Sequence, residues 1–272
     1  MSPADEGSSQ PLMQPNPVKA ALAAGETVYG TMVFELLGPG LPQILANAGA
    51  DFVVYDMEHS GFSPDQVKTQ LALCAGAGVV PIVRPPDAVH SETARLLDLG
   101  AMGLLFQMVE TAEQAEALVA STRYPPDGRR GAMFGGAHDR YRGGAAVPDV
   151  IAGAHERTMV VALIESAQGI ANAEEIMAVP GIDVGHLGHG DLSLSLGVPG
   201  DTAHPTMQHA IDTLLSACAH HGKAAGCLAG TVEVGRDWVQ RGFRMVSYSY
   251  DIGLLTSALA GGIAAIRTGG DT

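Results

Sequence analysis

The chain has 272 residues, which is long enough for one large domain with a substantial buried core. Its hydrophobic fraction of 46% and charged fraction of 16% are typical of a globular protein and argue against intrinsic disorder. The formal net charge of −14 argues against a nucleic-acid partner and against attraction to anionic membranes. An anionic substrate would therefore need a locally positive site.

The N-terminus and the cysteines indicate a cytoplasmic protein. Residues 1–20 contain the polar stretch MSPADEGSSQPLMQPNP, which lacks the basic and apolar regions of a signal peptide and predicts a flexible tail. Cys74, Cys218 and Cys227 form no CxxC pair and are expected to be buried thiols in a reducing compartment. The apolar stretch 252–266 is too short and too rich in small residues to span a bilayer.

Residues 21–272 alternate short apolar runs with longer helical segments, of which two begin with the capping residues Ser63 and Thr111. The continuous apolarity of the runs is typical of strands buried on both faces of a parallel sheet. The expected strands are residues 27–35, 51–58, 78–84, 103–109, 158–165, 182–188, 223–229 and 244–250. This periodicity predicts one (β/α)8 barrel over residues 21–272. A doubly wound open sheet is the alternative, although no glycine-rich phosphate-binding motif follows the first strand.

One connection breaks this alternation. Residues 123–157 are rich in Gly, Pro and Arg and contain six of the fifteen Lys and Arg residues. Long loops in compact domains are usually functional or disordered. We therefore predict that this segment is an anion-facing or subunit-facing lid.

Polar side chains close the apolar runs, at the end of a barrel where catalytic groups lie. They are Glu35, Asp56, Glu58, His59, Arg84, Gln107, Glu110, Glu165, His186, His189 and Asp191. No lysine is among them, and Lys223 precedes its strand at the opposite end of the barrel, which argues against a Schiff-base mechanism.

Glu165 and Asp191 follow adjacent apolar strands and are expected to lie close together. Two nearby carboxylates repel each other unless a cation joins them, and such pairs are typical ligands of Mg²⁺ or Mn²⁺. Alternatively, each carboxylate caps a helix N-terminus. A zinc or iron site made of His186, His189 and Asp191 is less favoured, because the two histidines would point to opposite faces of an extended strand.

Arg84 ends the third apolar run and, if buried, needs an anionic partner. That partner is either a structural carboxylate or the carboxylate or enolate of a substrate. Asp98, near the end of a helical segment, would by itself be read as a surface residue.

Six motifs resemble those of a known family. They are YDMEHS, PIVRPP, LLDLGAMGLL, TRYPPDGRRG, ALIES and GHGDLSLSLGVPGD. In this order and spacing they are similar to the HpcH/HpaI aldolases, metal-dependent (class II) pyruvate aldolases of the phosphoenolpyruvate/pyruvate barrel superfamily. The resemblance implies a (β/α)8 barrel whose C-terminal helix is swapped between subunits, in a homohexamer assembled as a trimer of dimers.

The resemblance also implies an activity, that of an aldehyde-lyase. The enzyme would cleave a 4-hydroxy-2-oxo acid into pyruvate and an aldehyde, and catalyse the reverse addition, with Mg²⁺, Mn²⁺ or Co²⁺. Oxaloacetate decarboxylation, or another lyase or ligase reaction of a pyruvate enolate, is the alternative on the same barrel. By motif match, Glu165 and Asp191 resemble the metal ligands, His59 the general base, and Arg84 the group that stabilises the enolate oxygen.

Two further roles follow from the same motifs. Asp98 resembles the residue that raises the basicity of the histidine, and Gly190 the backbone N–H that holds the pyruvate carboxylate. Three positions depart from the family pattern. Leu163 stands where many members have a glutamine that touches substrate, His189 replaces a common proline, and His186 occupies a position that is often aromatic or apolar. These departures leave the acceptor aldehyde open.

Overall fold

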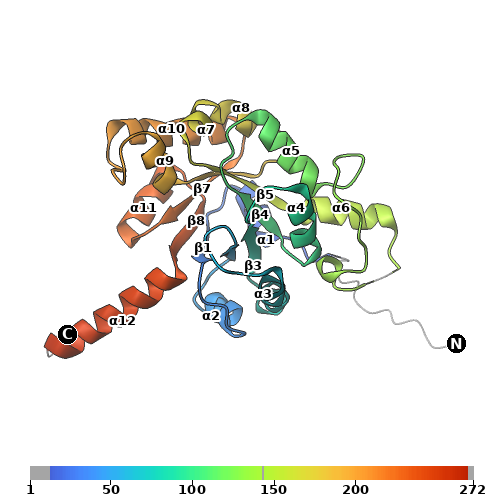
Figure 1. Ribbon diagram of the computed structural model, residues 1–272, viewed down its shortest axis with the longest axis horizontal. Coiled ribbons are helices and arrows are strands. Elements are labelled where there is room, and N and C mark those ends of the chain that lie inside the picture. The colour runs from blue at the N-terminus through green and yellow to red at the C-terminus, as the bar shows by residue number, and fades with distance from the viewer. Residues whose placement is uncertain (1–12, 143, 269–272) are drawn as a thin grey trace.

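Eight parallel strands close into a barrel in the order β1 to β8 in the computed structural model, which describes residues 13–142 and 144–268 (Figure 1). The strands are β1 (Val28–Val33), β2 (Phe52–Asp56), β3 (Val80–Arg84), β4 (Gly103–Phe106), β5 (Met159–Ile164), β6 (Val184–Leu187), β7 (Ala224–Ala229) and β8 (Met245–Tyr250). Each lies within a range expected from the sequence. The predicted (β/α)8 barrel is therefore confirmed, and the open sheet is excluded.

Helices connect successive strands and pack around the barrel. They are α2 (Leu41–Asn47), α3 (Pro64–Ala77), α4 (His90–Asp98), α5 (Ala112–Thr122), α6 (Val147–Arg157), α7 (Ala167–Ala171), α8 (Ala173–Ala178), α9 (His189–Ser195), α10 (Pro205–His220) and α11 (Val232–Arg241), with a 3-10 turn η1 (Ala137–Asp139). Ser63 and Thr111 form the expected capping boxes at the starts of α3 and α5. No helix in the described ranges is long and apolar enough to cross a membrane.

The core has two layers, one inside the barrel and one between the strands and the helices. The inner layer includes Val54, Ile82, Leu105, Val161 and Leu163, which are almost fully buried. Every residue of the central strands β2 to β6 is buried, as the continuous apolar runs predicted. The inner layer forms the floor on which the polar residues at the carboxyl ends of the strands lie. Cys74, Cys218 and Cys227 are buried free thiols, as expected.

The expected flexible tail over residues 1–20 is wrong for its last part. Helix α1 (Pro17–Ala23) begins after Asn16, and the Asn16 side-chain amide donates hydrogen bonds to the Met102 and Arg157 carbonyls at 3.0 Å each. Val18 is 2% exposed and belongs to the inner core layer. These contacts fix the segment across the amino ends of β4 and β5. Residues 1–12 lie outside the described residues.

The arginine-rich segment differs from the expectation in two ways. Its last part is helix α6, because Val150 and Ala154 supply a buried apolar face that the preceding glycines obscure in the sequence. Arg130 and Arg157 are 2% and 8% exposed and turn inward, where Arg157 donates to the His138 and Gly100 carbonyls. Among the described residues, none of this segment lines the cavity at the carboxyl ends of the strands. The segment is therefore no anion-facing lid over this chain's own site. A subunit-facing role stays a prediction.

Candidate active site

A cavity of about 240 Å³ opens at the carboxyl ends of the strands. Five of the six site residues that the family resemblance implied line it, namely His59, Arg84, Glu165, Gly190 and Asp191. Its floor is mainly apolar and includes Leu105, Leu163 and Leu228. Catalytic groups of β/α barrels lie at this end, so the position agrees with an active site.

Arg84 is held in the cavity wall by two carboxylates of the chain. It ends β3 directly beside Asp56 at the end of β2, and its Nε donates to the Asp56 carboxylate. Its Nη1 lies 2.8 Å from Glu58 Oε2, and its guanidinium carbon lies 5.8 Å from the centre of the Phe34 ring. The structural partners expected for a buried arginine are therefore present. They fix the guanidinium in one orientation while it still lines the cavity.

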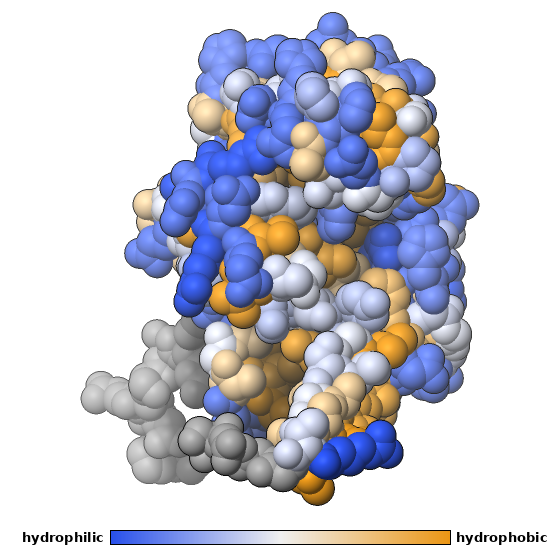
Figure 2. All heavy atoms as spheres, turned by 90° about the vertical axis from the view of Figure 1, so that its left-hand side faces the viewer, coloured by the Kyte–Doolittle hydropathy of each residue, from blue (hydrophilic) through white to orange (hydrophobic). Residues whose placement is uncertain are grey.

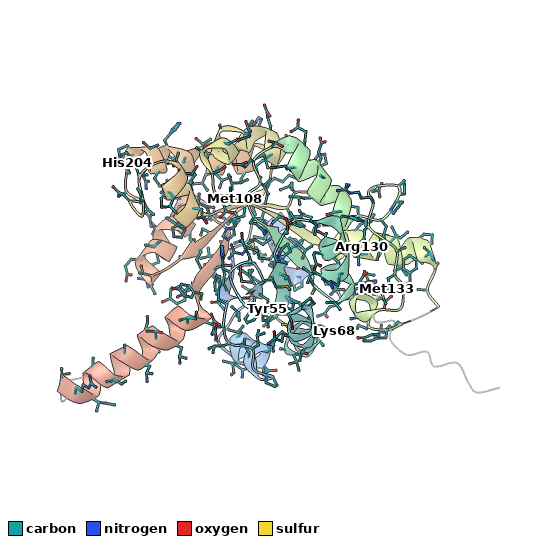
Figure 3. All side chains as sticks on the ribbon, viewed as in Figure 1. Tyr55, Lys68, Met108, Arg130, Met133 and His204 are labelled. Carbon is teal, nitrogen blue, oxygen red and sulfur yellow. The ribbon has the colours of Figure 1, made fainter. Side chains whose placement is uncertain are left out.

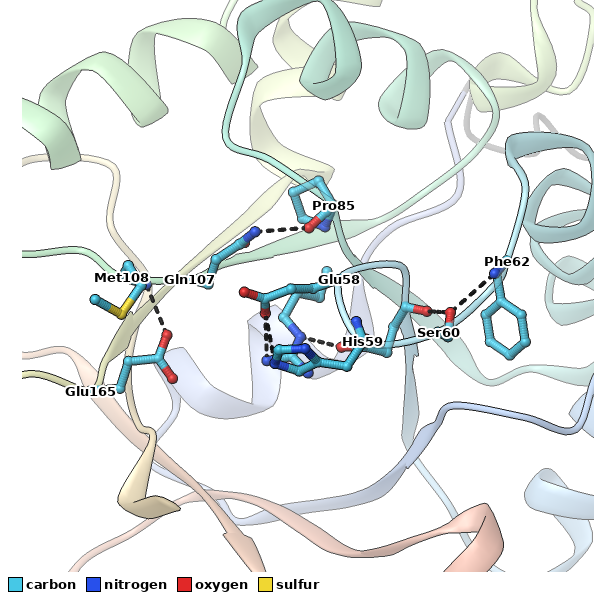
Figure 4. A network of polar contacts seen from close by, with 10 residues as sticks. Glu58, His59, Ser60, Phe62, Pro85, Gln107, Met108 and Glu165 are labelled. Carbon is cyan, nitrogen blue, oxygen red and sulfur yellow. Dashed lines mark hydrogen bonds and ion pairs between the residues drawn. The ribbon is translucent and has the colours of Figure 1, made fainter. Parts of the chain in front are cut away.

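His59 lies at the mouth of the cavity. Asp56 Oδ1 accepts a hydrogen bond from the His59 backbone N–H at 2.6 Å, and the Ser60 hydroxyl donates to the Asp56 carbonyl. The His59 ring is 58% exposed, and its Nε2 lies 3.5 Å from Glu58 Oε2 (Figure 4). Asp56 thus positions both Arg84 and the loop of His59. The imidazole is free to exchange a proton with a molecule in the cavity.

Glu165 is oriented by a strained turn after β4. The Met108 backbone N–H donates to Glu165 Oε1 at 2.9 Å (Figure 4), and Met108 has a φ of 52°, which is uncommon for a residue other than glycine. Gly188 also approaches Glu165 closely, since a Cβ at residue 188 would lie 2.4 Å from the Glu165 Cβ. A side chain at Gly188 would therefore displace this carboxylate.

The charges around Glu165 favour a cation. Burial, with smaller contributions from the nearby Asp191 and Glu58 carboxylates, raises the pKa of Glu165 to about 7, against the lowering effects of the Met108 N–H and the Arg84 guanidinium. Asp191 and Gly190 lie in the first turn of α9. The position of Asp191 matches the helix-cap alternative, but Glu165 caps no helix, because Ser166 is the cap of α7. Two carboxylates in one cavity, one of them buried, are a suitable ligand set for a divalent cation.

This raised pKa predicts how the stability of the metal-free protein changes with pH. The folded protein binds the Glu165 proton more tightly than the unfolded chain, whose carboxyl has a pKa of 4.5, so stability falls as pH rises from 4.5 to about 7. In EDTA, we expect urea unfolding to show a loss of up to about 3 kcal/mol between pH 5 and pH 8 in the natural chain. Glu165→Gln should lack this loss, whereas the exposed control Glu175→Gln should retain it. An equal loss in Glu165→Gln would contradict the prediction.

Asp98 lies away from His59 within this chain. It ends α4, and the Arg130 Nη2 donates to its carboxylate at 2.6 Å. Helices of the barrel run back against the strands, so the last turn of α4 lies at the opposite end of the barrel from His59. Figure 3 shows Arg130 on the side of the molecule near α4 and α6, away from Met108 at the barrel mouth. Within this chain the structure does not bring Asp98 to His59, and the carboxylate beside His59 is Glu58.

A different set of metal-compatible groups lies on the surface. Glu174, His220 and His221 have ligand atoms within 4.8 Å of one another, and His221 Nε2 lies 2.9 Å from Glu174 Oε1. Glu174 and His220 are more than half exposed. In the described residues, His186, His189 and Asp191 do not form such a group. The proposed zinc or iron alternative therefore gains no support.

Comparison with known proteins shows the family of this chain. Residues 32–258 match the HpcH/HpaI aldolase/citrate lyase family. The chain is 40% identical over 243 residues to the hydroxypyruvate/pyruvate aldolase of Chromohalobacter salexigens, covering 89% of this chain and 94% of the relative. It is 36% identical over 247 residues to the 5-keto-4-deoxy-D-glucarate aldolase of Klebsiella pneumoniae, covering 90% and 94%. The crystal structure of an HpcH/HpaI aldolase from Desulfitobacterium hafniense superposes with a TM-score of 0.86 at 29% identity, covering 92% and 96%.

Proposed function

Because this chain belongs to the HpcH/HpaI aldolase/citrate lyase family, we propose that it is a divalent-metal-dependent aldolase. It cleaves a 4-hydroxy-2-oxo acid into pyruvate and an aldehyde, and it catalyses the reverse addition. The observation that carries this proposal is the meeting of four groups in one cavity. These are the Glu165 and Asp191 carboxylates, the fixed Arg84 guanidinium and the exposed His59 ring.

Glu165 and Asp191 would hold Mg²⁺, Mn²⁺ or Co²⁺, which supplies positive charge to the carboxylate and 2-oxo oxygens of the substrate. His59 takes the proton of the C4 hydroxyl as the bond between C3 and C4 breaks and the aldehyde forms. The electron pair of that bond moves toward the 2-oxo oxygen, where Arg84 stabilises the growing negative charge. The Gly190 backbone N–H binds the substrate carboxylate.

Glu58 has two tasks in this proposal. Its Oε2 atom lies 2.8 Å from Arg84 Nη1 and 3.5 Å from His59 Nε2. It therefore holds the guanidinium in place and pairs with the imidazole ring when the ring carries a proton. In this chain Glu58 takes the position beside the histidine for which the sequence motif suggested Asp98.

A pyruvate-release assay over a panel of 4-hydroxy-2-oxo acids tests the activity. The panel includes aldol products of pyruvate and of hydroxypyruvate, because a relative is named for both acids, and the assay detects whichever of the two acids is released. We expect release from at least one substrate in the presence of Mg²⁺ or Mn²⁺, whereas no release from any substrate would refute the proposal. The variant His59→Ala distinguishes aldol cleavage from the alternative activity, oxaloacetate decarboxylation. That variant should lose aldol cleavage far more than decarboxylation, because decarboxylation removes no hydroxyl proton.

We also propose that the chain forms a homo-oligomer through its C-terminal helix α12 (Asp251–Thr268). Figure 1 shows this helix projecting away from the barrel, and Asp251 is its one buried residue. Leu255 and Leu259 are 56% and 60% exposed. Next to the helix, apolar atoms are visible in a hollow of the surface (Figure 2), and a recess of about 390 Å³ is lined by Tyr29, Val239 and other residues of α11, β1 and β8. An exposed apolar helix beside an open apolar recess suits exchange of α12 between subunits.

Light scattering tests this assembly. We expect a particle of six times the 28.0 kDa chain mass for the natural chain. The double variant Leu255→Asp, Leu259→Asp should dissociate, because charged side chains cannot be buried in an apolar recess without partners. Glu175→Gln, on α8, is the matched surface control and should keep the natural mass. A monomeric natural chain, or an unchanged mass in the double variant, would contradict the exchange of α12.

A further inference from the structure

His186 is a buried polar side chain in the cavity floor that the proposed reaction leaves without a task. It lies on β6 and lines the cavity, and it is 3% exposed. Neither of its ring nitrogens has a hydrogen-bond partner among the described residues. A buried polar group without a partner costs on the order of 1–3 kcal/mol, so its retention needs an explanation.

No side chain around His186 serves as a hydrogen-bond partner for its ring nitrogens. Its neighbour across the β5–β6 ladder is Leu163, and the other floor residues include Leu105 and Leu228. The Arg84 guanidinium is engaged by Asp56 and Glu58. Burial, assisted by the charges of Arg84 and His189 and opposed by a contact with the Leu187 backbone, lowers the pKa of His186 to about 3, so the ring is neutral. A neutral imidazole offers one N–H donor and one acceptor, which is the complement of a hydroxyl group.

The ring is also fixed in place. A Cβ added at Gly226 on β7 would lie 2.7 Å from the His186 Cδ2 atom. The imidazole therefore packs directly on the glycine backbone, and only a residue without a side chain fits there. Such packing holds the two nitrogens in a constant position relative to the cavity, as a specificity-determining group requires.

We propose that His186 binds a hydroxyl group on the third carbon of the 2-oxo acid, and so selects a 3-hydroxy-2-oxo acid over pyruvate as the nucleophile. The proposal rests on the proposed aldolase function. The strand register places Leu163 beside His186 and Ile164 beside Leu187, so Glu165 follows directly above this row. His59 lies instead at the exposed mouth, where the aldehyde enters.

The position of His186 below Glu165 makes the acid, not the aldehyde, its partner. A 2-oxo acid whose oxo and carboxylate oxygens face the cation that Glu165 and Asp191 would hold has its third carbon one bond away from the oxo carbon. A hydroxyl on that carbon is the substituent that reaches the floor. In pyruvate the same carbon is a methyl group, which leaves both imidazole nitrogens unpaired and lowers affinity.

Two measurements with hydroxypyruvate and with pyruvate test the proposal, both in the presence of Mg²⁺. Titration calorimetry measures the affinity for each acid, and initial rates of addition to one common aldehyde measure kcat/KM. The natural chain should prefer hydroxypyruvate. His186→Leu should lower that preference by about 10- to 100-fold in both affinity and kcat/KM, because one buried hydrogen-bonding group is lost. His186→Gln, which keeps a donor and an acceptor, should retain part of the preference. The matched control Leu163→Met changes the neighbouring floor residue without polar atoms and should shift both acids together.

Two results would overturn the proposal. An unchanged preference in a folded His186→Leu protein would show that the ring touches neither acid. Equal losses for both acids would place the ring on the carboxylate or oxo group that they share. Failure of the proposed function is distinguishable, because the natural chain would then release no product from either acid. The calorimetric preference for hydroxypyruvate and its loss in His186→Leu would still decide the role of the ring.

Discussion

Glu165→Ala is expected to lower kcat/KM for cleavage of the preferred 4-hydroxy-2-oxo acid by about 10³-fold or more, and Asp191→Ala by a similar factor. Either change leaves one carboxylate to hold the cation, which supplies several kcal/mol of charge stabilisation. In Glu165→Ala the Met108 N–H also loses its acceptor, since it donates to Glu165 Oε1 at 2.9 Å.

Pyruvate release measured at several metal concentrations checks this prediction. Glu110→Ala is the matched control, because Glu110 also follows a strand but accepts a hydrogen bond from the Ser166 hydroxyl at 2.6 Å and does not line the cavity. It should retain activity within roughly threefold, as changes away from a site usually do. Retention of more than about a tenth of the natural activity in Glu165→Ala at low metal concentration would contradict a ligand role.

Arg84→Ala should have the second largest effect, and it should act on both catalysis and stability. Loss of a fixed donor to a developing oxyanion typically costs about 10²- to 10³-fold in kcat. The variant also leaves Asp56, which is 0% exposed, without its ion-pair partner. Breaking a buried pair on one side typically costs about 3–5 kcal/mol of unfolding free energy.

Arg84→Lys separates the two effects of Arg84. Lysine keeps the charge for Asp56, so unfolding in urea should show a smaller loss of stability than in Arg84→Ala. A lysine ammonium cannot contact Asp56, Glu58 and the substrate oxygen with the fixed geometry of a guanidinium, so kcat should stay well below that of the natural chain. Equal kcat in Arg84→Lys and the natural chain would show that charge alone suffices at this position.

The strands could be predicted from the sequence because each is a continuous apolar run closed by a polar residue, and every one of the central strands is buried on both faces. The helices α1 and α6 could not. Both helices begin with a local signal, a proline in the first turn, but their buried faces and the long-range bonds of Asn16 and Arg157 depend on the closed barrel. The local sequence alone does not indicate this packing.

Four of the site residues could be predicted from the same pattern of strands and polar ends. His59, Arg84, Glu165 and Asp191 line the cavity because each follows a strand or opens the next helix. Within the chain Asp98 lies apart from His59, because Arg130, 32 residues away in sequence, holds its carboxylate, and its expected role toward the histidine stays a prediction. The Met108 N–H that orients Glu165 was missed, since nothing in the residue type of Met108 indicates a positive φ.

Removal and return of the metal test the central claim most directly. The protein is dialysed against EDTA, and pyruvate release from its preferred 4-hydroxy-2-oxo acid is measured before and after Mg²⁺, Mn²⁺ or Co²⁺ is added. The proposed function predicts no measurable release in chelator and recovery of the original rate with at least one of these ions. Full activity in chelator would contradict a metal-dependent aldolase.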